Sequence, residues 1–254
     1  MALLGDGTAW VLSRDYGVIS RVRYREGVGA EPPFHRWPRS LPRDSDEDDE
    51  YIPGDDLGRI SVLLDINVLL RPHGELHPHD LAVSGDRLLV LCGGRWNRRY
   101  ARICVFDSET GAFLYHIGRG LDAGEADALI GPEALATHQD LCFVADTYNH
   151  AIKIYNFRQR ELVRTMGSTA NSPYEENTWH DNLAYEDPRR SDLPCEFNEP
   201  AGVAFRDGRL YVSESGGRRI QILRFASGIQ GAVECLQIIP SPNGLQLSGL
   251  CISG

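Results

Sequence analysis

The stretch RPHGELHPHD, residues 71–80, is the first place where the side chains of this sequence could do metal chemistry. Imidazole and carboxylate groups are ordinary zinc ligands, but at these spacings they share one ion only if the segment folds back on itself. The six cysteines add no CxxC or close CxxH motif that would supply further ligands. The candidate ligands are His73, Glu75, His77, His79 and Asp80. A plainer interpretation is that His79 caps the end of a strand.

A second cluster is basic, in the stretch GGRWNRRYAR. It consists of Arg95, Trp96, Arg98, Arg99, Tyr100 and Arg102. Guanidinium groups beside aromatic rings suit a phosphate, a carboxylate or single-stranded nucleic acid. They also pair with acids of neighbouring elements or extend over a rim, so the sequence leaves both interpretations open.

Composition lowers the expectation for several classes of protein. The formal net charge of −10 argues against coating DNA or an anionic membrane through overall charge. We find no G-x-S-x-G elbow, no glycine-rich phosphate loop after a strand and no paired carboxylates on a recognisable scaffold. We therefore expect no cofactor and no metal ligand set, and we leave open whether the chain is an enzyme.

The location of the protein is predicted from three weaker signals. No apolar run approaches the roughly 20 residues of a membrane span, and the N-terminus MALLGDGTAW does not read as a signal peptide. Cys92, Cys104, Cys142 and Cys251 sit in apolar runs, which is typical of small buried free thiols. Together these features favour a cytoplasmic protein.

An internal repeat determines the fold prediction. Residues 199–225 align with residues 131–157 so that Leu210 falls under Cys142 and Glu214 under Asp146. A third copy covers residues 77–106, with extra residues at its polar crossing, and a weaker copy begins near Met1. A further copy starts at residue 245 and supplies a single strand. Such a period predicts a repeat architecture.

Each copy predicts four antiparallel strands. A short apolar strand meets a turn such as Asp207-Gly208, then follow a second apolar strand, a polar crossing and a third strand. Fourth strands are expected at residues 59–66, 113–118, 162–167 and 234–239. This predicts an all-β fold, a β-propeller of four-stranded antiparallel blades, in one domain over 1–254. The blades are expected at about 1–70, 77–118, 131–167 and 198–240, with a further blade starting at 245–254.

The stretch ADTYNHAIKIY resembles the D-x-x-N-H-R-I core of NHL repeats, and VSESGGRRIQIL is a looser copy. The resemblance implies an NHL-type propeller like those at the C-termini of tripartite-motif ubiquitin ligases, where the ring recruits protein or RNA. That family usually closes rings of about six blades, so we expect a segment of a larger ring, with a small closed ring as the alternative. Pro78-His79-Asp80-Leu81 also resembles the P-H-x-[LM] zinc motif of peptide-amidating lyases. The equivalent Glu133, Ala201 and Ser248 supply no further histidine.

The strand order assigns the loops to two ends of the ring. The crossings between second and third strands, and the connections between blades, should share one end, which we call the top face. Channel-mouth residues there would be His79, Asp80 and Glu133. The predicted partner-binding residues are those of the basic cluster with His150, Arg218 and Arg219. Asp146 and Asn149 are expected to bond their own turn backbone as structural residues.

Two inserts interrupt the repeat. Residues 29–56 carry six acids between Asp44 and Glu50 that repel one another, so this segment is expected to be solvated and disordered. Residues 168–196 carry Tyr174, Trp179 and Tyr185 and are expected either to cover the channel or to form a mobile arm.

We interpret the chain as a non-catalytic interaction module that holds a protein or peptide partner on its top face. An RNA-binding NHL module linked to ubiquitin transfer or post-transcriptional regulation is the first alternative. A metal-dependent propeller lyase or hydrolase is the second. We expect no membrane and no DNA among its partners.

Overall fold

The structure is a computed structural model that describes residues 2–4, 8–13, 18–23, 60–65, 77–93, 101–118, 127–167, 190–247 and 249–250. Sixteen strands in these ranges form four sheets of four strands each. The first sheet contains β1 (Ala2–Leu3), β2 (Thr8–Ser13), β3 (Val18–Arg23) and β4 (Ile60–Asp65). The second contains β5 (His77–Ser84), β6 (Arg87–Gly93), β7 (Arg102–Asp107) and β8 (Phe113–Ile117).

The other two sheets repeat this pattern. The third contains β9 (Ala134–His138), β10 (Leu141–Asp146), β11 (Ala151–Asn156) and β12 (Glu161–Gly167). The fourth contains β13 (Pro200–Arg206), β14 (Arg209–Glu214), β15 (Arg219–Phe225) and β16 (Val233–Pro240). Short 3-10 helices cover Thr147–Asn149 and Pro242–Gly244. In every sheet the strands pair antiparallel in chain order, as the repeat predicts.

The strand composition follows from burial on both faces of a sheet. The second strand of a unit, such as β6 with the sequence RLLVLCG, reads as a continuous apolar run because neighbouring sheets cover both of its faces. The turn between β13 and β14 uses Asp207 and Gly208, at φ of 51° and 71°. Positive φ at both central residues suits a tight two-residue hairpin, which places β14 directly against β13.

Three apolar clusters fill the seams between successive sheets. Trp10, Ile19 and Leu88 are central to the seam between the first and second sheets. Leu91 and Phe157 belong to the next seam, between the second and third sheets. The last seam holds Phe143, Phe197 and Leu223, among others, between the third and fourth sheets. The core is therefore a series of interfaces between sheets.

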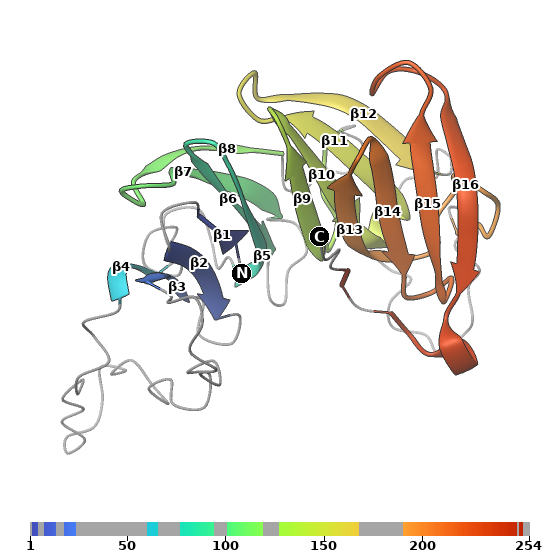
Figure 1. The fold of residues 1–254 in the computed structure, drawn as a ribbon, viewed down its shortest axis with the longest axis horizontal. Helices are drawn as coiled ribbons and strands as arrows, with labels where there is room; N and C mark the ends of the chain where they lie inside the picture. The colour runs from blue at the N-terminus through green and yellow to red at the C-terminus, as the bar shows by residue number, and fades with distance from the viewer. Residues whose placement is uncertain are drawn as a thin grey trace.

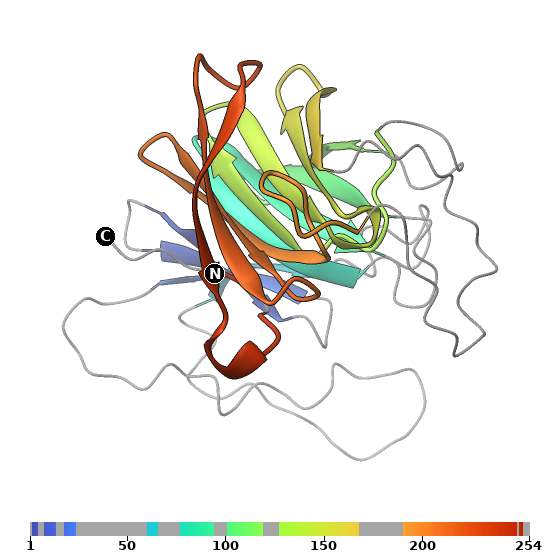
Figure 2. The same ribbon diagram turned by 90° about the vertical axis from the view of Figure 1, so that its right-hand side faces the viewer.

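The four sheets follow one another along an arc, with the first and fourth sheets at its two ends (Figure 1). The innermost strands β1, β5, β9 and β13 contact one another in turn. In Figure 2 the fourth sheet faces the viewer with its outermost strand β16. This arrangement confirms the predicted fold class, a β-propeller of four-stranded antiparallel blades.

The predicted fourth strands are confirmed at β4, β8, β12 and β16. The start of a further blade remains a prediction, although the backbone of Gly249 and Leu250 lies beside Gly202 of β13. The grouping of the whole chain into one domain also remains a prediction. Insert 29–56 lies outside the described residues, and of insert 168–196 only residues 190–196 lie inside them.

The prediction of buried free thiols is confirmed for those of its four cysteines that the structure describes. Cys92, Cys104 and Cys142 are buried free thiols, and Cys251 lies outside the described residues. Burial raises the pKa of the Cys142 thiol, which keeps it protonated and unreactive in the folded chain. No helix within the described ranges is long and apolar enough to span a membrane.

Candidate partner-binding face

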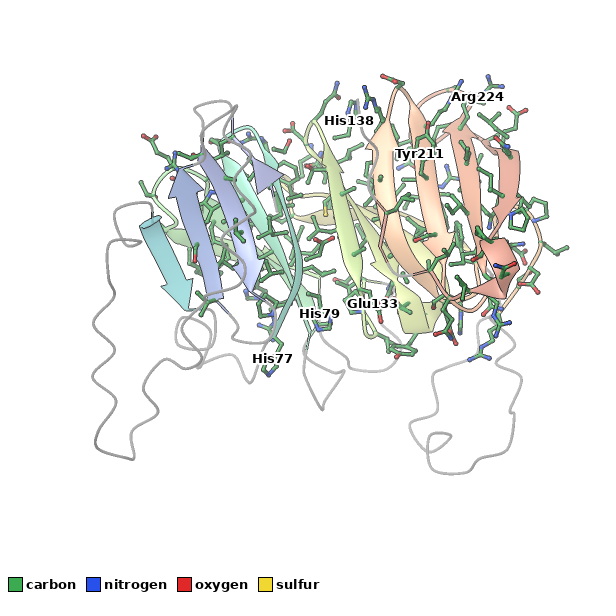
Figure 3. All side chains as sticks on the ribbon, turned by 60° about the horizontal axis from the view of Figure 1, so that its bottom comes forward. His77, His79, Glu133, His138, Tyr211 and Arg224 are labelled. Carbon is green, nitrogen blue, oxygen red and sulfur yellow. The ribbon has the colours of Figure 1, made fainter. Side chains whose placement is uncertain are left out.

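In the third and fourth blades, the crossing and the connection before the first strand meet at one end of the molecule, as predicted. In the third sheet the Tyr148 N–H donates to the Ile130 carbonyl (3.2 Å), so the crossing rests on the connection before β9. In the fourth sheet the Ser215 N–H donates to the Glu199 carbonyl (2.8 Å) in the same way. Figure 3 shows His77, His79 and Glu133 at this top face, and His138 and Arg224 toward the opposite end.

Asp146, at the end of β10, organises the top of the third blade. Its Oδ1 accepts a hydrogen bond from the Ile130 N–H (2.7 Å), and its Oδ2 accepts one from Asn149 Nδ2 (2.6 Å). The Lys153 ammonium lies 3.2 Å from Oδ2. Asn149 also donates to the Ala128 carbonyl (3.2 Å). Asp146 and Asn149 are structural residues, but they hold the preceding connection to the crossing and do not only close their own turn.

Burial dominates the electrostatics of this pair. Side-chain exposure is 0% for Asp146 and 5% for Lys153. Loss of hydration raises the pKa of Asp146, and the nearby Lys153 opposes that rise. Lys153 Nζ additionally donates to the Ala128 carbonyl. The site is satisfied internally, so it supports the top face and presents nothing to a partner.

The fourth blade repeats the device with different residues. Glu214, at the end of β14, accepts from Arg219 Nε (2.8 Å), from Gln221 Nε2 (2.8 Å) and from the Asn198 N–H (2.8 Å). Burial raises the pKa of Glu214, and its hydrogen bond from Arg219 opposes the rise. Glu214 and Asp146 occupy equivalent strand ends, so both blades use a buried acid to attach the crossing to the connection before the first strand.

Two of the predicted partner-binding residues are buried within the fold. Arg219 is 7% exposed and gives its remaining donors to the carbonyls of Asp192, Leu193 and Glu196, because the connection before β13 wraps around its guanidinium. His150 is 2% exposed, and its Nδ1 accepts from the Glu199 N–H (3.0 Å). We therefore correct the prediction for both residues and assign them to blade packing.

The other predicted partner-binding residues fall into two groups. Arg218 is exposed at the crossing of the fourth blade, and Arg102 is half-buried at the start of β7. The remaining members of the basic cluster, Arg95, Trp96, Arg98, Arg99 and Tyr100, lie outside the described residues, so their role remains a prediction.

The predicted channel-mouth residues lie where the innermost strands begin. Asp80 accepts from the Leu81 N–H (2.9 Å) through Oδ1 and from the Leu135 N–H (2.9 Å) of β9 through Oδ2. It therefore links the second blade to the third at a bulge in β5. The His79 imidazole packs closely over Gly93. Glu133 is half-buried just before β9.

No three His, Cys, Asp or Glu side chains gather around a metal-sized position in the part of the chain that the structure describes. His79 is therefore not joined by a described ligand set. The sequence reasoning missed Lys153 and Gln221 as supporting residues of the top face. Each lies between two isoleucines of a third strand, in AIKIYN and RIQILRF, and a polar residue at such a position is a signal for a buried partner.

Comparison with known proteins supports the fold and nothing finer. No family model and no curated protein matches the sequence. A luciferin-regenerating enzyme aligns with a TM-score of 0.54 at 13% identity, over 99% of this chain and 64% of that chain. The WD40 repeats of RRP9 align with a TM-score of 0.48 at 12% identity, over 92% of this chain and 49% of that chain. A functionally unknown protein from Desulfotomaculum acetoxidans DSM 771 aligns with a TM-score of 0.47 at 10% identity, over 93% of this chain and 54% of that chain.

Proposed function

We propose that this β-propeller is of the NHL type and acts as a non-catalytic interaction module that holds a protein or peptide partner on its top face. The chain spans less than two thirds of the length of each of the three solved structures described above. The proposal therefore concerns the surface of this chain and no activity of a longer protein.

One observation carries the proposal. In the third and fourth blades a buried acid fixes the crossing to the connection before the first strand, through Asp146 and Glu214. The backbone at the top of these two blades is thereby held in place, while one crossing position presents different side chains, the exposed Arg218 in the fourth blade and the buried His150 in the third. A rigid scaffold that presents variable loop residues is the usual arrangement of a binding surface.

Arg218 is the described residue best placed to contact a partner. It is exposed at the crossing of the fourth blade, next to the buried Arg219. Its guanidinium can form paired hydrogen bonds with a carboxylate of an acidic peptide. With Arg219 and His150 assigned to packing, the described part of the top face has fewer free cations than the sequence predicted. This favours a protein partner over RNA.

The test compares two charge reversals at opposite ends of the same blade. Arg218→Glu changes the top face, and Arg209→Glu changes an exposed arginine at the opposite end, where β14 begins. Purified chain is used as bait in extracts, and captured proteins are quantified by mass spectrometry. We expect a defined set of proteins to be lost with Arg218→Glu and retained with Arg209→Glu. Equal capture by both variants would contradict the proposed face.

The basic cluster can be tested in the same format. Replacing Arg98 and Arg99 by Glu is expected to weaken capture of the same proteins. Capture that disappears after ribonuclease treatment and falls steeply with added salt would instead indicate the RNA alternative.

A further inference from the structure

Cys195 and Cys235 meet at the outer edge of the fourth blade. Cys195 belongs to the connection before β13, and Cys235 lies in the outermost strand β16. The Cys195 thiol donates to the Val233 carbonyl (3.8 Å) and accepts a backbone hydrogen bond from Cys235. The sulfur of Cys195 therefore lies against the stretch of β16 that carries the second cysteine.

A shared acceptor brings the two residues together from the other side. Gln221 Oε1 accepts from the Cys195 N–H (3.0 Å) and from the Cys235 thiol (3.6 Å). One amide oxygen of β15 thus holds the backbone of one cysteine and the side chain of the other. Both thiols are free in the structure. Because both cysteines bond to the same amide oxygen and the Cys195 thiol contacts the backbone at Cys235, the two thiols can approach each other with small side-chain rotations.

The two cysteines also differ from the other thiols in access. Cys195 and Cys235 are half-buried, whereas Cys92, Cys104 and Cys142 are 0% exposed. Small oxidants reach an edge strand more readily than the seams between blades. The fold therefore separates one accessible pair from thiols that are shielded in the core.

We propose that Cys195 and Cys235 form a reversible disulfide when the chain meets a low-molecular-weight disulfide such as oxidised glutathione. One thiol loses its proton, and its thiolate attacks a sulfur of the oxidant, forming a mixed disulfide and releasing one glutathione thiolate. The second cysteine, also as thiolate, attacks the protein sulfur of that mixed disulfide and releases the other glutathione. Two protein thiols are oxidised, and one glutathione disulfide is reduced to two thiols.

The bond would fasten the connection to the outermost strand. Hydrogen bonds and packing against the apolar seam hold Cys195 there, although its φ of 66° lies in the left-handed region that a non-glycine residue adopts only when its surroundings require it. A disulfide restricts the unfolded chain between the two cysteines, which stabilises the folded state. Burial raises the pKa of the Cys195 thiol, so the reaction should accelerate as the pH rises. This inference is independent of the proposed partner-binding function.

The experiment uses the folded full chain with oxidised glutathione at mildly alkaline pH, followed by alkylation and peptide mapping without reduction. We expect a 195–235 cross-linked peptide, a mass loss of two hydrogen atoms, and a Tm higher by about 5–10 °C, all reversed by dithiothreitol. Cys235→Ser, which keeps a hydroxyl donor near Gln221, should acquire glutathione at Cys195 without cross-linking.

The wild-type map decides the matter even if a variant fails to fold. A stable glutathione adduct on either cysteine of the wild type, a cross-link between other cysteines, or unreacted Cys195 and Cys235 after prolonged incubation would each overturn the proposal. Unreacted Cys92, Cys104 and Cys142 in the same sample serve as the internal control for a folded protein.

Discussion

Replacing Asp146 by Ala should destabilise the chain far more than the loss of a surface charge. The change leaves the Lys153 ammonium without its counter-ion in a site where that side chain is 5% exposed. It also removes the acceptor of the buried Ile130 N–H. Removing one partner of a buried ion pair lowers the free energy of unfolding by about 3–5 kcal/mol. A buried N–H left without an acceptor adds part of a further ~1–3 kcal/mol. We expect a total of about 4 kcal/mol.

Urea unfolding followed by circular dichroism measures this difference. With a slope of about 3 kcal/mol per molar urea, the midpoint should fall by about 1.3 M. The matched control is Glu234→Ala, which breaks the Arg224–Glu234 pair at 2.5 Å. Both of those side chains are 55% exposed, so its loss should cost less than about 1 kcal/mol.

A double-mutant cycle separates the ion pair from the rest of the site. Lys153→Met removes the buried charge, so Asp146→Ala should cost less in that background, with a coupling energy of about 2 kcal/mol. An Asp146→Ala cost below about 1 kcal/mol, or a coupling energy within about 0.5 kcal/mol of zero, would refute the view that this pair holds the top face.

Three further changes test how the blades are joined. Gly202→Ala places a methyl group 2.6 Å from the backbone of the segment that lies against β13, and should lower the unfolding free energy by about 1–3 kcal/mol in a urea titration. Thr147→Val removes the 2.8 Å hydrogen bond to the Pro200 carbonyl of the next blade, and should cost about 1–2 kcal/mol by the same assay; an unchanged midpoint would mean that this bond contributes nothing. Arg158→Ala leaves Asp86 paired with Arg87 alone, and the pKa of Asp86 is held below its ordinary value of 3.8 chiefly by Arg158. The stabilisation from this pair is present above pH 3.8 and is lost as the pH falls through the lowered pKa of Asp86. The unfolding free energies of wild type and variant should therefore converge in acid and in high salt. A difference that persists under those conditions would contradict the assignment.

The fold could be predicted from sequence because the repeated positions are residues of the strands themselves. The alignment of Leu210 with Cys142 and of Glu214 with Asp146 places both pairs at matching positions of β14 and β10. Apolar runs, hairpin turns and the order of elements are local properties, so they can be recognised in the sequence without knowledge of tertiary contacts. Even the short β8 was found at its predicted place.

The candidate site could be predicted only as a region. Arg218 and Arg219 are adjacent in sequence, yet one is exposed and the other is wrapped by the connection before β13. Arg218 lies in the turn before β15, whereas Arg219 is the first residue of the strand and meets residues 191–196 where they return to the sheet, which is a long-range property. In the same way Asp146 reads as a turn residue in isolation, whereas two of its partners lie outside that turn, the Ile130 N–H of the preceding connection and Lys153 of β11.

The carbonyl shell around Arg219 also bears on how the chain tolerates changes in length. Because the guanidinium gathers the carbonyls of residues 191, 192, 193 and 196, the chain re-enters the sheet at one anchored point before β13. Lengthening a connection upstream of such an anchor adds only a slowly growing entropy cost and does not shift the strand that follows. We therefore expect that residues inserted between Gly167 and Arg190 leave the register of β13 in the fourth blade unchanged.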